Sequence, residues 1–307
     1  MRKILSVSLS IFLFLLFAFA NTSISSAEDE QVIHTGVLGF LGTTETRFQE
    51  GLDLFRTKIP SGYQERIYGS GFVKSLRTEK RVIHFFGSLM RMVMNLRSGK
   101  VDEIMLPEDV GRYITNLNSE IQVKYVSEVF SSKISFAFRK ENAELKAEFD
   151  RAILEMKKDG TIDELSKTFI HTANPKPVRP EHFAGAETIT VAVTGDMPPI
   201  DMFAGDGKPA GYNTAILAEI GKRLKKNIRL LSIEAAARNS ALISGRADVV
   251  FWYRTVKIEI GDAEIDNSVF IDAPDEIILS EPYYSWNREF ILKMSDRTGF
   301  WGLFKRK

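Results

Sequence analysis

Two stretches of the chain repeat one pattern: "LRSGKVDEIM", which begins at Leu96, and "LISGRADVVF", which begins at Leu242. Both read Leu-x-Ser-Gly-basic-x-Asp and then become apolar. Glycine suits the left-handed residue that ends a helix, a basic residue complements the negative helix end, and a short apolar run is typical of a buried strand. We interpret the pair as one helix-to-strand turn made in each of two α/β lobes. The alternative explanation of the repeat is that any turn from a helix to a strand favours these residue types, whether or not the two lobes are related.

The rest of the chain alternates between strand and helix patterns. Apolar residues at helical spacing, such as Leu89, Met92, Val93 and Leu96, predict amphipathic helices. Predicted helices cover 43–55, 89–96, 142–160, a segment from Thr161 with a Thr161–Glu164 capping box, 211–224 with Asn213 as its cap, and a short helix before Gly245. Predicted strands cover 32–40, 63–70, 101–106, 123–130, 133–140, 188–195, 228–233 and 247–253. This alternation predicts mostly parallel sheets with helices on both faces.

The segment 171–187 holds three prolines, which stiffen the backbone and remove helix donors, and we interpret it as a linker. The predicted organisation is a signal peptide at 1–27, an α/β domain at 31–170, this linker, a second α/β domain at 188–294 and a basic aromatic tail at 295–307. The signal peptide is inferred from two basic residues, an apolar run and small exit residues, with an uncleaved membrane anchor as the alternative.

Composition excludes several classes of function. The 307 residues carry a formal net charge of +1, which gives no reason to expect nucleic acid as a partner. The absence of cysteine excludes disulfides and thiolate chemistry. The four histidines are scattered, and no phosphate loop, dinucleotide fingerprint or nucleophile elbow is present. We therefore predict no catalytic residues, no metal, no cofactor and no enzyme.

Several motifs together resemble a known family. "TITVAVTGDMPPIDMFAGDGKPAGYNTAILAEIGKRL", "SALISGRADVVF" and "LSEPYYSW" are similar to the first lobe of the family 3 extracellular solute-binding proteins, the receptors of polar amino-acid ABC transporters. "SLMRMVMNLRSGKVDEI" and "FAFRKENAELKAEFDRAILEMKKDGTIDEL" resemble the second lobe and its closing helices. The resemblance implies an α/β fold of the type II periplasmic-binding-protein class: two doubly wound lobes joined by a hinge.

The order of the lobes differs from the family, because the first-lobe motifs come last in this chain. We interpret this reversal as a circular permutation, which closely spaced termini make tolerable. A truncated tandem of two receptors and a self-contained first block are the alternatives.

Ligands of such folds lie outside the carboxyl ends of the strands, so residues just past the strands are candidates. Asp196 would receive an ammonium group or serve as a turn residue, and Trp252 and Tyr253 would form an aromatic wall or pack in the core. Arg254 or Arg238 would clamp a carboxylate unless they are surface residues. The remaining candidates are the helix cap formed by Thr43 or Thr44, and Glu108.

The family's ligand motifs are incomplete here. No arginine follows Thr255 at the usual spacing, Pro107 and Glu108 stand where an aspartate is usual, and Asn213 replaces an acid. The resemblance therefore implies the fold more firmly than amino-acid specificity. A site could be rebuilt from Arg254, Arg238 and Glu108.

The predicted function is that of a monomeric periplasmic protein that captures a small polar solute, an amino acid or related, for the membrane permease of an ABC importer. The alternative is a ligand-sensing or interaction module of the same fold that no longer binds an amino acid.

Overall fold

A computed structural model of the chain describes residues 32–38, 80–127, 131–172, 175–260, 263–265, 276–286 and 288–295. The predicted signal peptide, the predicted helix at 43–55, the predicted strand at 63–70 and all of the predicted tail except Ser295 lie outside these ranges. Among the helices of the described ranges, none combines the length and the apolar character needed to cross a membrane.

One body of the protein is built on a five-stranded sheet, in the order β2-β1-β3-β14-β4. The first three strands pair in parallel, and β14 pairs antiparallel with both β3 and β4. Helices α5 (Leu89–Arg97) and α6 (Glu108–Leu117) pack on this sheet. Its strands are β1 (Val32–Leu38), β2 (Lys80–Phe86), β3 (Glu103–Pro107), β4 (Ile121–Ser127) and β14 (Glu289–Met294).

The other body is built on a seven-stranded sheet whose main path is β12-β5-β10-β6-β9, with β11 pairing to β10 and β13 to β5. Strands β9, β6 and β10 are parallel, whereas β5 runs antiparallel to β10. Its strands are β5 (Ser131–Arg139), β6 (Thr188–Val193), β9 (Asn227–Ser232), β10 (Val249–Ile260), β11 (Ala263–Ile265), β12 (Ile277–Leu279) and β13 (Tyr284–Trp286). A small hairpin of β7 (Met202–Phe203) and β8 (Pro209–Ala210) joins this body.

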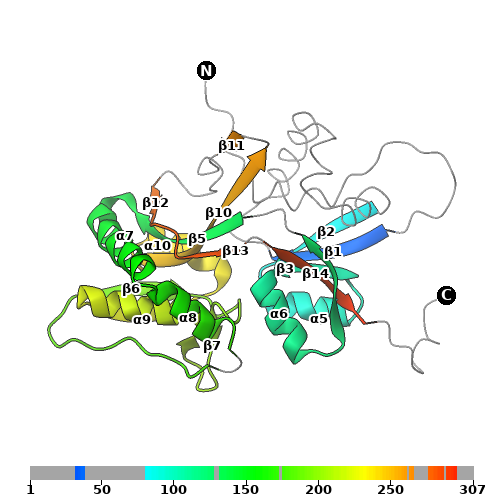
Figure 1. The fold of residues 1–307 in the computed structure, drawn as a ribbon, viewed down its shortest axis with the longest axis horizontal. Helices are drawn as coiled ribbons and strands as arrows, with labels where there is room; N and C mark the ends of the chain where they lie inside the picture. Colours follow the sequence, from blue (N-terminus) through cyan, green and yellow to red (C-terminus); the bar gives the residue numbers. More distant parts are fainter. Residues whose placement is uncertain are drawn as a thin grey trace.

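The helices of the seven-stranded body are α7 (Ala143–Lys158), α8 (Thr161–Phe169), α9 (Tyr212–Leu224) and α10 (Arg238–Ile243). Figure 1 shows this body on the left and the five-stranded body on the right. The predicted fold, two α/β lobes joined by a hinge, is confirmed. The sheets are mixed rather than mostly parallel, because β14 and β5 each enter their sheet in the reverse direction.

The repeated pattern forms the same turn twice. Gly99 and Gly245 adopt left-handed φ values of 72° and 74°, and each donates its N–H to the leucine three residues earlier at 3.1 Å. The aspartate of each copy then binds the adjacent strand. Asp102 Oδ2 accepts the N–H of His34 in β1, and Asp248 Oδ2 accepts the N–H of Thr190 in β6, both at 2.8 Å. The prediction of one turn used in both lobes is confirmed at atomic level.

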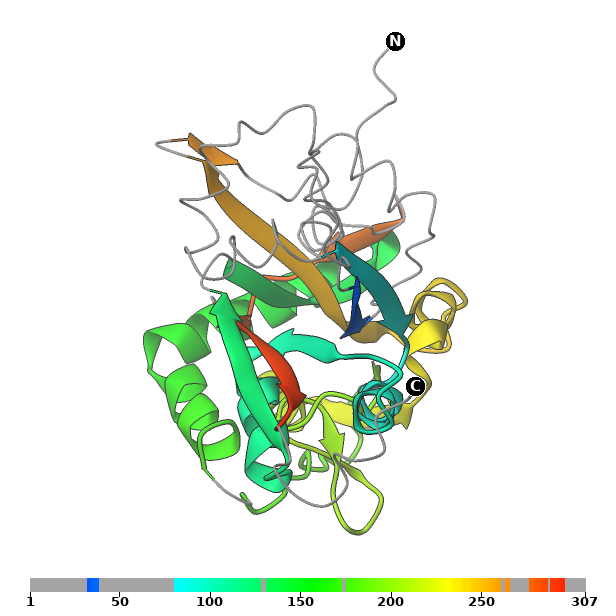
Figure 2. The same ribbon diagram turned by 90° about the vertical axis from the view of Figure 1, so that its right-hand side faces the viewer.

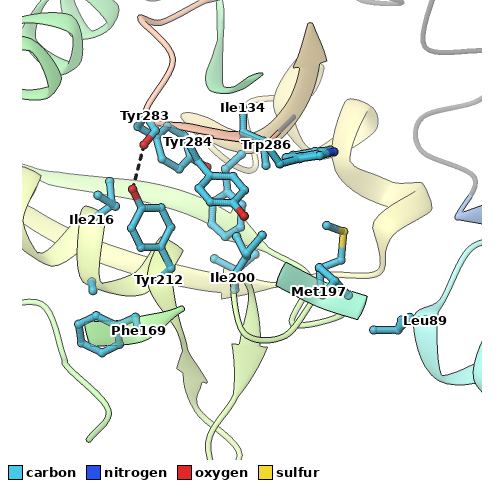
Figure 3. Packing of buried hydrophobic residues seen from close by; sticks show 14 of the residues in the cluster. Leu89, Ile134, Phe169, Met197, Ile200, Tyr212, Ile216, Tyr283, Tyr284 and Trp286 are labelled. Carbon is cyan, nitrogen blue, oxygen red and sulfur yellow. Dashed lines mark hydrogen bonds between the residues drawn. The ribbon is translucent and has the colours of Figure 1, made fainter. Parts of the chain in front are cut away.

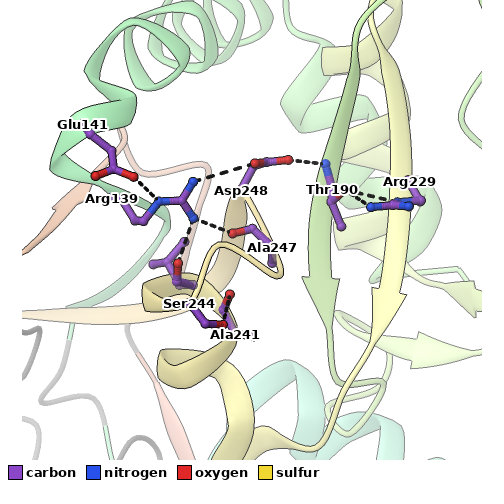
Figure 4. A network of polar contacts seen from close by, with 9 residues as sticks. Arg139, Glu141, Thr190, Arg229, Ala241, Ser244, Ala247 and Asp248 are labelled. Carbon is purple, nitrogen blue, oxygen red and sulfur yellow. Dashed lines mark hydrogen bonds and ion pairs between the residues drawn. The ribbon is translucent and has the colours of Figure 1, made fainter.

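A network of hydrogen bonds fixes the second copy of the turn to β5. Arg139 Nη1 donates to the carbonyl oxygens of Leu242 at 2.8 Å and Ala247 at 2.9 Å. Its Nε donates to Glu141, and its Nη2 lies 3.9 Å from Asp248 Oδ1 (Figure 4). Through these bonds, Arg139 links β5, from the first half of the chain, to the repeated turn in the second half.

The sheets divide the chain at other places than the sequence predicted. Residues 131–170 were expected in the first domain, yet β5, α7 and α8 belong to the seven-stranded body. The chain passes between the bodies after β4 and again after β13. Figure 2 shows the last strand, β14, lying alongside β4, and the two are paired through most of their length.

The proline-rich segment at 171–187, predicted as a linker, lies against the seven-stranded body. Arg179 donates to the carbonyl oxygen of Pro209 and to the carboxylate of Asp206. The amide of Asn227 accepts from the N–H of Phe183 at 2.8 Å and donates back to its carbonyl oxygen. The segment thus connects two parts of one body.

Two predicted helix caps are wrong. Helix α8 begins after Gly160, whose φ of 82° places it at the N-cap, and Thr161 instead bonds the side chain of Asp159. Helix α9 begins after Gly211, so Asn213 lies inside the first turn, where its Oδ1 accepts from the hydroxyl of Tyr283 at 3.1 Å. In both cases a glycine with positive φ takes the terminal position, and the polar side chain finds another partner.

Buried aromatic rings pack together in the core of the seven-stranded body (Figure 3). The Phe136 and Tyr283 rings stack with centroids 4.2 Å apart, and the hydroxyl of Tyr212 donates to the carbonyl oxygen of Tyr283 at 2.9 Å. Tyr284 and Trp286 continue this cluster along β13. The second crossing between the bodies therefore leaves from a rigid, well-packed strand.

Candidate functional site

A cavity of about 1000 Å³ lies between the two bodies. The five-stranded body lines it with α6. The seven-stranded body lines it with the end of α8, the start of the proline-rich segment, the loop after β6 and strand β13. The loop after β6 and helix α6 both follow the carboxyl end of a parallel strand, where α/β folds place ligands.

The α6 wall is acidic. Pro107 ends β3 and precedes the helix, and Glu108 and Asp109 occupy the first helical turn, where carboxylates are favoured by the helix dipole. Glu108 Oε1 accepts from Arg112 Nε at 2.9 Å and from Arg288 Nη1 at 3.2 Å. These bonds engage one carboxylate oxygen of Glu108, Oε1.

Asp109 links the two bodies across the cavity. Its Oδ2 accepts a hydrogen bond from the hydroxyl of Tyr284 on β13, and its Oδ1 lies 3.9 Å from Nδ1 of His171, just after α8. Burial, followed by the charge of Asp109, raises the pKa of the Tyr284 phenol well above its usual value, so this hydroxyl remains a donor. The contact joins β13 to the first turn of α6.

The opposite wall is supported by a buried carboxylate. Asp201 Oδ2 accepts hydrogen bonds from the hydroxyl of Thr194 at 2.8 Å and from the N–H of Gly195 at 2.9 Å. Burial raises the pKa of Asp201 to about 6, although these hydrogen bonds oppose the shift. The bonds draw the loop after β6 into a compact bend, which presents Pro199, Met202 and Phe203 to the cavity.

Aromatic side chains make up much of the remaining lining. They come from both bodies: Tyr113 from α6, Phe169 from α8, Trp286 from β13 and Phe203 from the hairpin. Trp286 and Phe169 are buried, whereas Phe203 is 38% exposed. The cavity therefore combines acidic groups on one wall with flat apolar surfaces around them.

Of the residues predicted from sequence, Glu108 lines the cavity. Asp196 is half-buried in the loop after β6, where it accepts from the Thr194 hydroxyl, and Arg238 is buried at the start of α10, donating to the carbonyl oxygen of Ala235 at 3.2 Å. Neither contributes to the lining. The backbone of Trp252, Tyr253 and Arg254 belongs to β10, but their side chains, like Thr43 and Thr44, lie outside the described part of the structure.

Sequence reasoning missed Asp109, Tyr113, Phe169 and His171 as lining residues. The signal available for Asp109 was its position directly after a buried strand and beside Glu108. The others become neighbours only because α6 and the end of α8 line the same cavity.

Two of the histidines described as scattered are in contact. Nδ1 of His34 on β1 and Nε2 of His84 on β2 are 2.8 Å apart. Burial and the neighbouring His34 lower the pKa of His84, while Asp102 opposes this. Across the described ranges, no three histidine, aspartate or glutamate side chains gather in a way that could hold a metal ion.

Comparison with known proteins gives a match to one family model over part of the chain. Residues 189–257 match the model of the bacterial extracellular solute-binding proteins, family 3. A search of curated proteins gave no match. The matched segment runs from β6 into β10 and includes the second copy of the repeated turn.

Solved structures with distant likeness include a ligand-binding component of an ABC-type import system from Staphylococcus aureus, with 11% identity, a TM-score of 0.39, and coverage of 86% of this chain and 66% of that one. The periplasmic domain of BvgS from B. pertussis has 13% identity, a TM-score of 0.37, and coverage of 87% and 38%. The alkanesulfonate-binding protein SsuA from Xanthomonas axonopodis has 10% identity, a TM-score of 0.38, and coverage of 88% and 68%.

The chain spans less than two thirds of the length of the first two of these proteins. At such TM-scores the likeness carries no argument about ligand or partner. The match over 189–257 coincides with the motifs that suggested the resemblance, so this part of the chain is similar to the bacterial extracellular solute-binding proteins, family 3.

Proposed function

We propose that this protein captures a small polar solute in the cavity between its two bodies and delivers it, in the periplasm, to the membrane permease of an ABC importer. The observation that carries the proposal is the cavity itself. Its volume of about 1000 Å³ is that of a small-molecule site, and it lies between two bodies joined by two chain crossings. Two crossings between α/β bodies form a hinge about which the bodies can close on a ligand.

The reversed order of the lobes is part of this proposal. In its support, residues of the family 3 segment and residues 131–170 build one body, while β14 inserts into the sheet built from residues 32–127. The protein would act as a monomer, because a single chain supplies both walls of the cavity.

The test is to purify the protein without denaturation, identify any bound solute by native mass spectrometry, and measure its binding by calorimetry. Gly205 lines the cavity and has open space where a Cβ would be, so Gly205→Trp would fill the cavity without a backbone clash. Gly87 also has open space and lies outside the cavity lining, so Gly87→Trp is the matched control.

We expect Gly205→Trp to abolish solute binding and Gly87→Trp to preserve it. If both variants bound the solute like the unmodified protein, the cavity would not be the site. If no solute were recovered and none of a panel of amino acids, amines and carboxylates bound, the protein would be the interaction module that the sequence left as the alternative.

A further inference from the structure

The lining of the cavity constrains the chemical class of its ligand. Besides the phenol of Tyr113, four titratable side chains contribute to the described lining: Glu108, Asp109, Arg112 and His171. The side chains of Glu108 and Asp109 are 17% and 16% exposed, so both carboxylates are largely shielded from water. A ligand in the cavity would therefore meet negative groups under weak solvent screening.

The single arginine of the lining is already engaged. Nε and Nη2 of Arg112 both donate to Glu108 Oε1, and its guanidinium carbon lies 5.3 Å from the centroid of the Phe290 ring. A carboxylate-binding arginine offers two parallel N–H groups to its ligand. In Arg112, one such pair of N–H groups binds Glu108 of the protein itself.

The carboxylates, in contrast, retain acceptor capacity. Tyr284 occupies one oxygen of Asp109, and Arg112 and Arg288 occupy one oxygen of Glu108. In the part of the chain that the structure describes, neither Asp109 Oδ1 nor Glu108 Oε2 accepts a hydrogen bond, and the former lies 3.9 Å from Nδ1 of His171. An ammonium donor entering the cavity would find both oxygens.

Aromatic faces complete this chemistry. Tyr113 lies one turn along α6 from Asp109, and Trp286 and Phe169 line the facing wall. Aromatic rings attract cations through their negative faces, and the attraction is larger in a site shielded from water. Acidic groups beside several rings favour a cation that also carries apolar surface.

From these observations we infer that the cavity selects an organic ammonium ion without a carboxylate group, such as an amino alcohol or a diamine. The inference rests on the proposed function and narrows it. A free amino acid would place its carboxylate near Glu108 or Asp109 with Arg112 already engaged, and a dicarboxylate would meet repulsion twice. Cations are the class that the two shielded carboxylates favour, and the one arginine of the described lining is paired with Glu108.

The experiment measures binding of four named probes to the full chain by calorimetry: ethanolamine, 1,4-diaminobutane, glutamine and succinate. We expect at least one of the two amines to bind and the other two compounds not to bind. Asp109→Asn removes the charge but keeps an acceptor for Tyr284, and it should weaken amine binding about tenfold or more, which corresponds to the loss of one good interaction.

Asp163→Asn is the control, since Asp163 also lies in the first turn of a helix, α8, but outside the cavity lining. It should leave binding unchanged. Tyr113→Leu provides a second test that leaves the charges intact, and it should weaken amine binding severalfold.

The outcomes separate this inference from the proposed function. Binding of glutamine or succinate in preference to the amines, or recovery of a bound carboxylate from the purified protein, would overturn the inference and leave solute capture standing. Amine binding that neither Asp109→Asn nor Tyr113→Leu weakens would also overturn it. Failure of all four probes, with no solute recovered from the purified protein, would overturn both.

Discussion

Asp201 is the single residue whose environment conflicts most with its charge. It is fully buried, and within the described structure its Oδ1 has no hydrogen-bond partner, whereas its Oδ2 accepts from Thr194 and Gly195. Asp196, which shares the Thr194 hydroxyl, adds a second negative charge nearby. The carboxyl of Asp201 therefore holds the loop after β6 in its bend. The free-energy cost of burying this carboxyl is larger when it is ionised.

This cost predicts a pH dependence of stability. Because burial raises the pKa of Asp201 from 3.8 to about 6, the folded protein keeps a proton that the unfolded chain loses in this interval. Stability is then highest below the unfolded pKa and falls as the pH rises toward the folded one. This group should lower the free energy of unfolding by about 2 kcal/mol between pH 4 and pH 7.

The measurement is urea unfolding over that pH range. Asp201→Asn keeps an oxygen that accepts from Thr194 and Gly195, and it cannot ionise. The free energy of unfolding of this variant should therefore not decline between pH 4 and pH 7 through this group. Asp196→Asn, as the comparison, should keep most of the decline. An Asp201→Asn variant with the same pH profile as the unmodified protein would show that the carboxyl stays protonated, or stays charged without cost.

At the scale of elements, the repeated turn joins each helix to its strand through one aspartate. Asp248 is half-buried beside Arg139, whereas Asp102 is exposed. Each accepts one N–H from the neighbouring parallel strand. Water can replace the bond of the exposed copy more easily than the bond of the covered one.

We therefore expect unequal losses from two matched substitutions. Asp248→Ala should reduce the free energy of unfolding by about 1–3 kcal/mol, because it leaves a strand N–H and part of Arg139 unsatisfied, and Asp102→Ala should cost about 1 kcal/mol or less. Chemical unfolding of both variants checks the order. Equal losses would mean that the Arg139 network adds nothing to the second copy.

The elements themselves were largely predictable, and their caps and partners were not. Leu89, Met92, Val93 and Leu96 have helical spacing and are all buried on α5. The caps at Thr161 and Asn213 were wrong because side-chain chemistry suggests a cap, whereas the glycine φ angles decide where the helix begins.

The candidate site was predictable in its location and much less in its residues. The carboxyl ends of β3 and β6 were expected to face a ligand, and helix α6 after β3 and the loop after β6 do line the cavity. However, whether Asp196 or Asp109 points into that space depends on which hydrogen bonds their neighbours form, and Phe169 and His171 arrive from a helix distant in sequence. No local sequence pattern predicts such packing.

At the scale of the whole molecule, Tyr284 and Asp109 join the two bodies by one side-chain hydrogen bond. Tyr284→Phe removes this bond and keeps the ring. We expect the bodies to separate more readily, with a larger radius of gyration in small-angle X-ray scattering and a loss of about 1 kcal/mol in stability.

Tyr283→Phe is the internal control, because the hydroxyl of Tyr283 bonds to Asn213 within one body. It should lower stability without changing the radius of gyration. If both variants had the same scattering curve, the Tyr284 bond would not hold the bodies together.

The place of β14 has a consequence for how the molecule is made. This strand lies between β3 and β4, which precede it by more than half of the chain. Until residues 289–294 have been synthesised, β3 and β4 each present a row of unpaired backbone groups, and exposed edges of this kind recruit strands from other molecules. Crowded expression should therefore favour exchange of β14 between neighbouring copies, and a holding chaperone would be most needed by the half that is synthesised first.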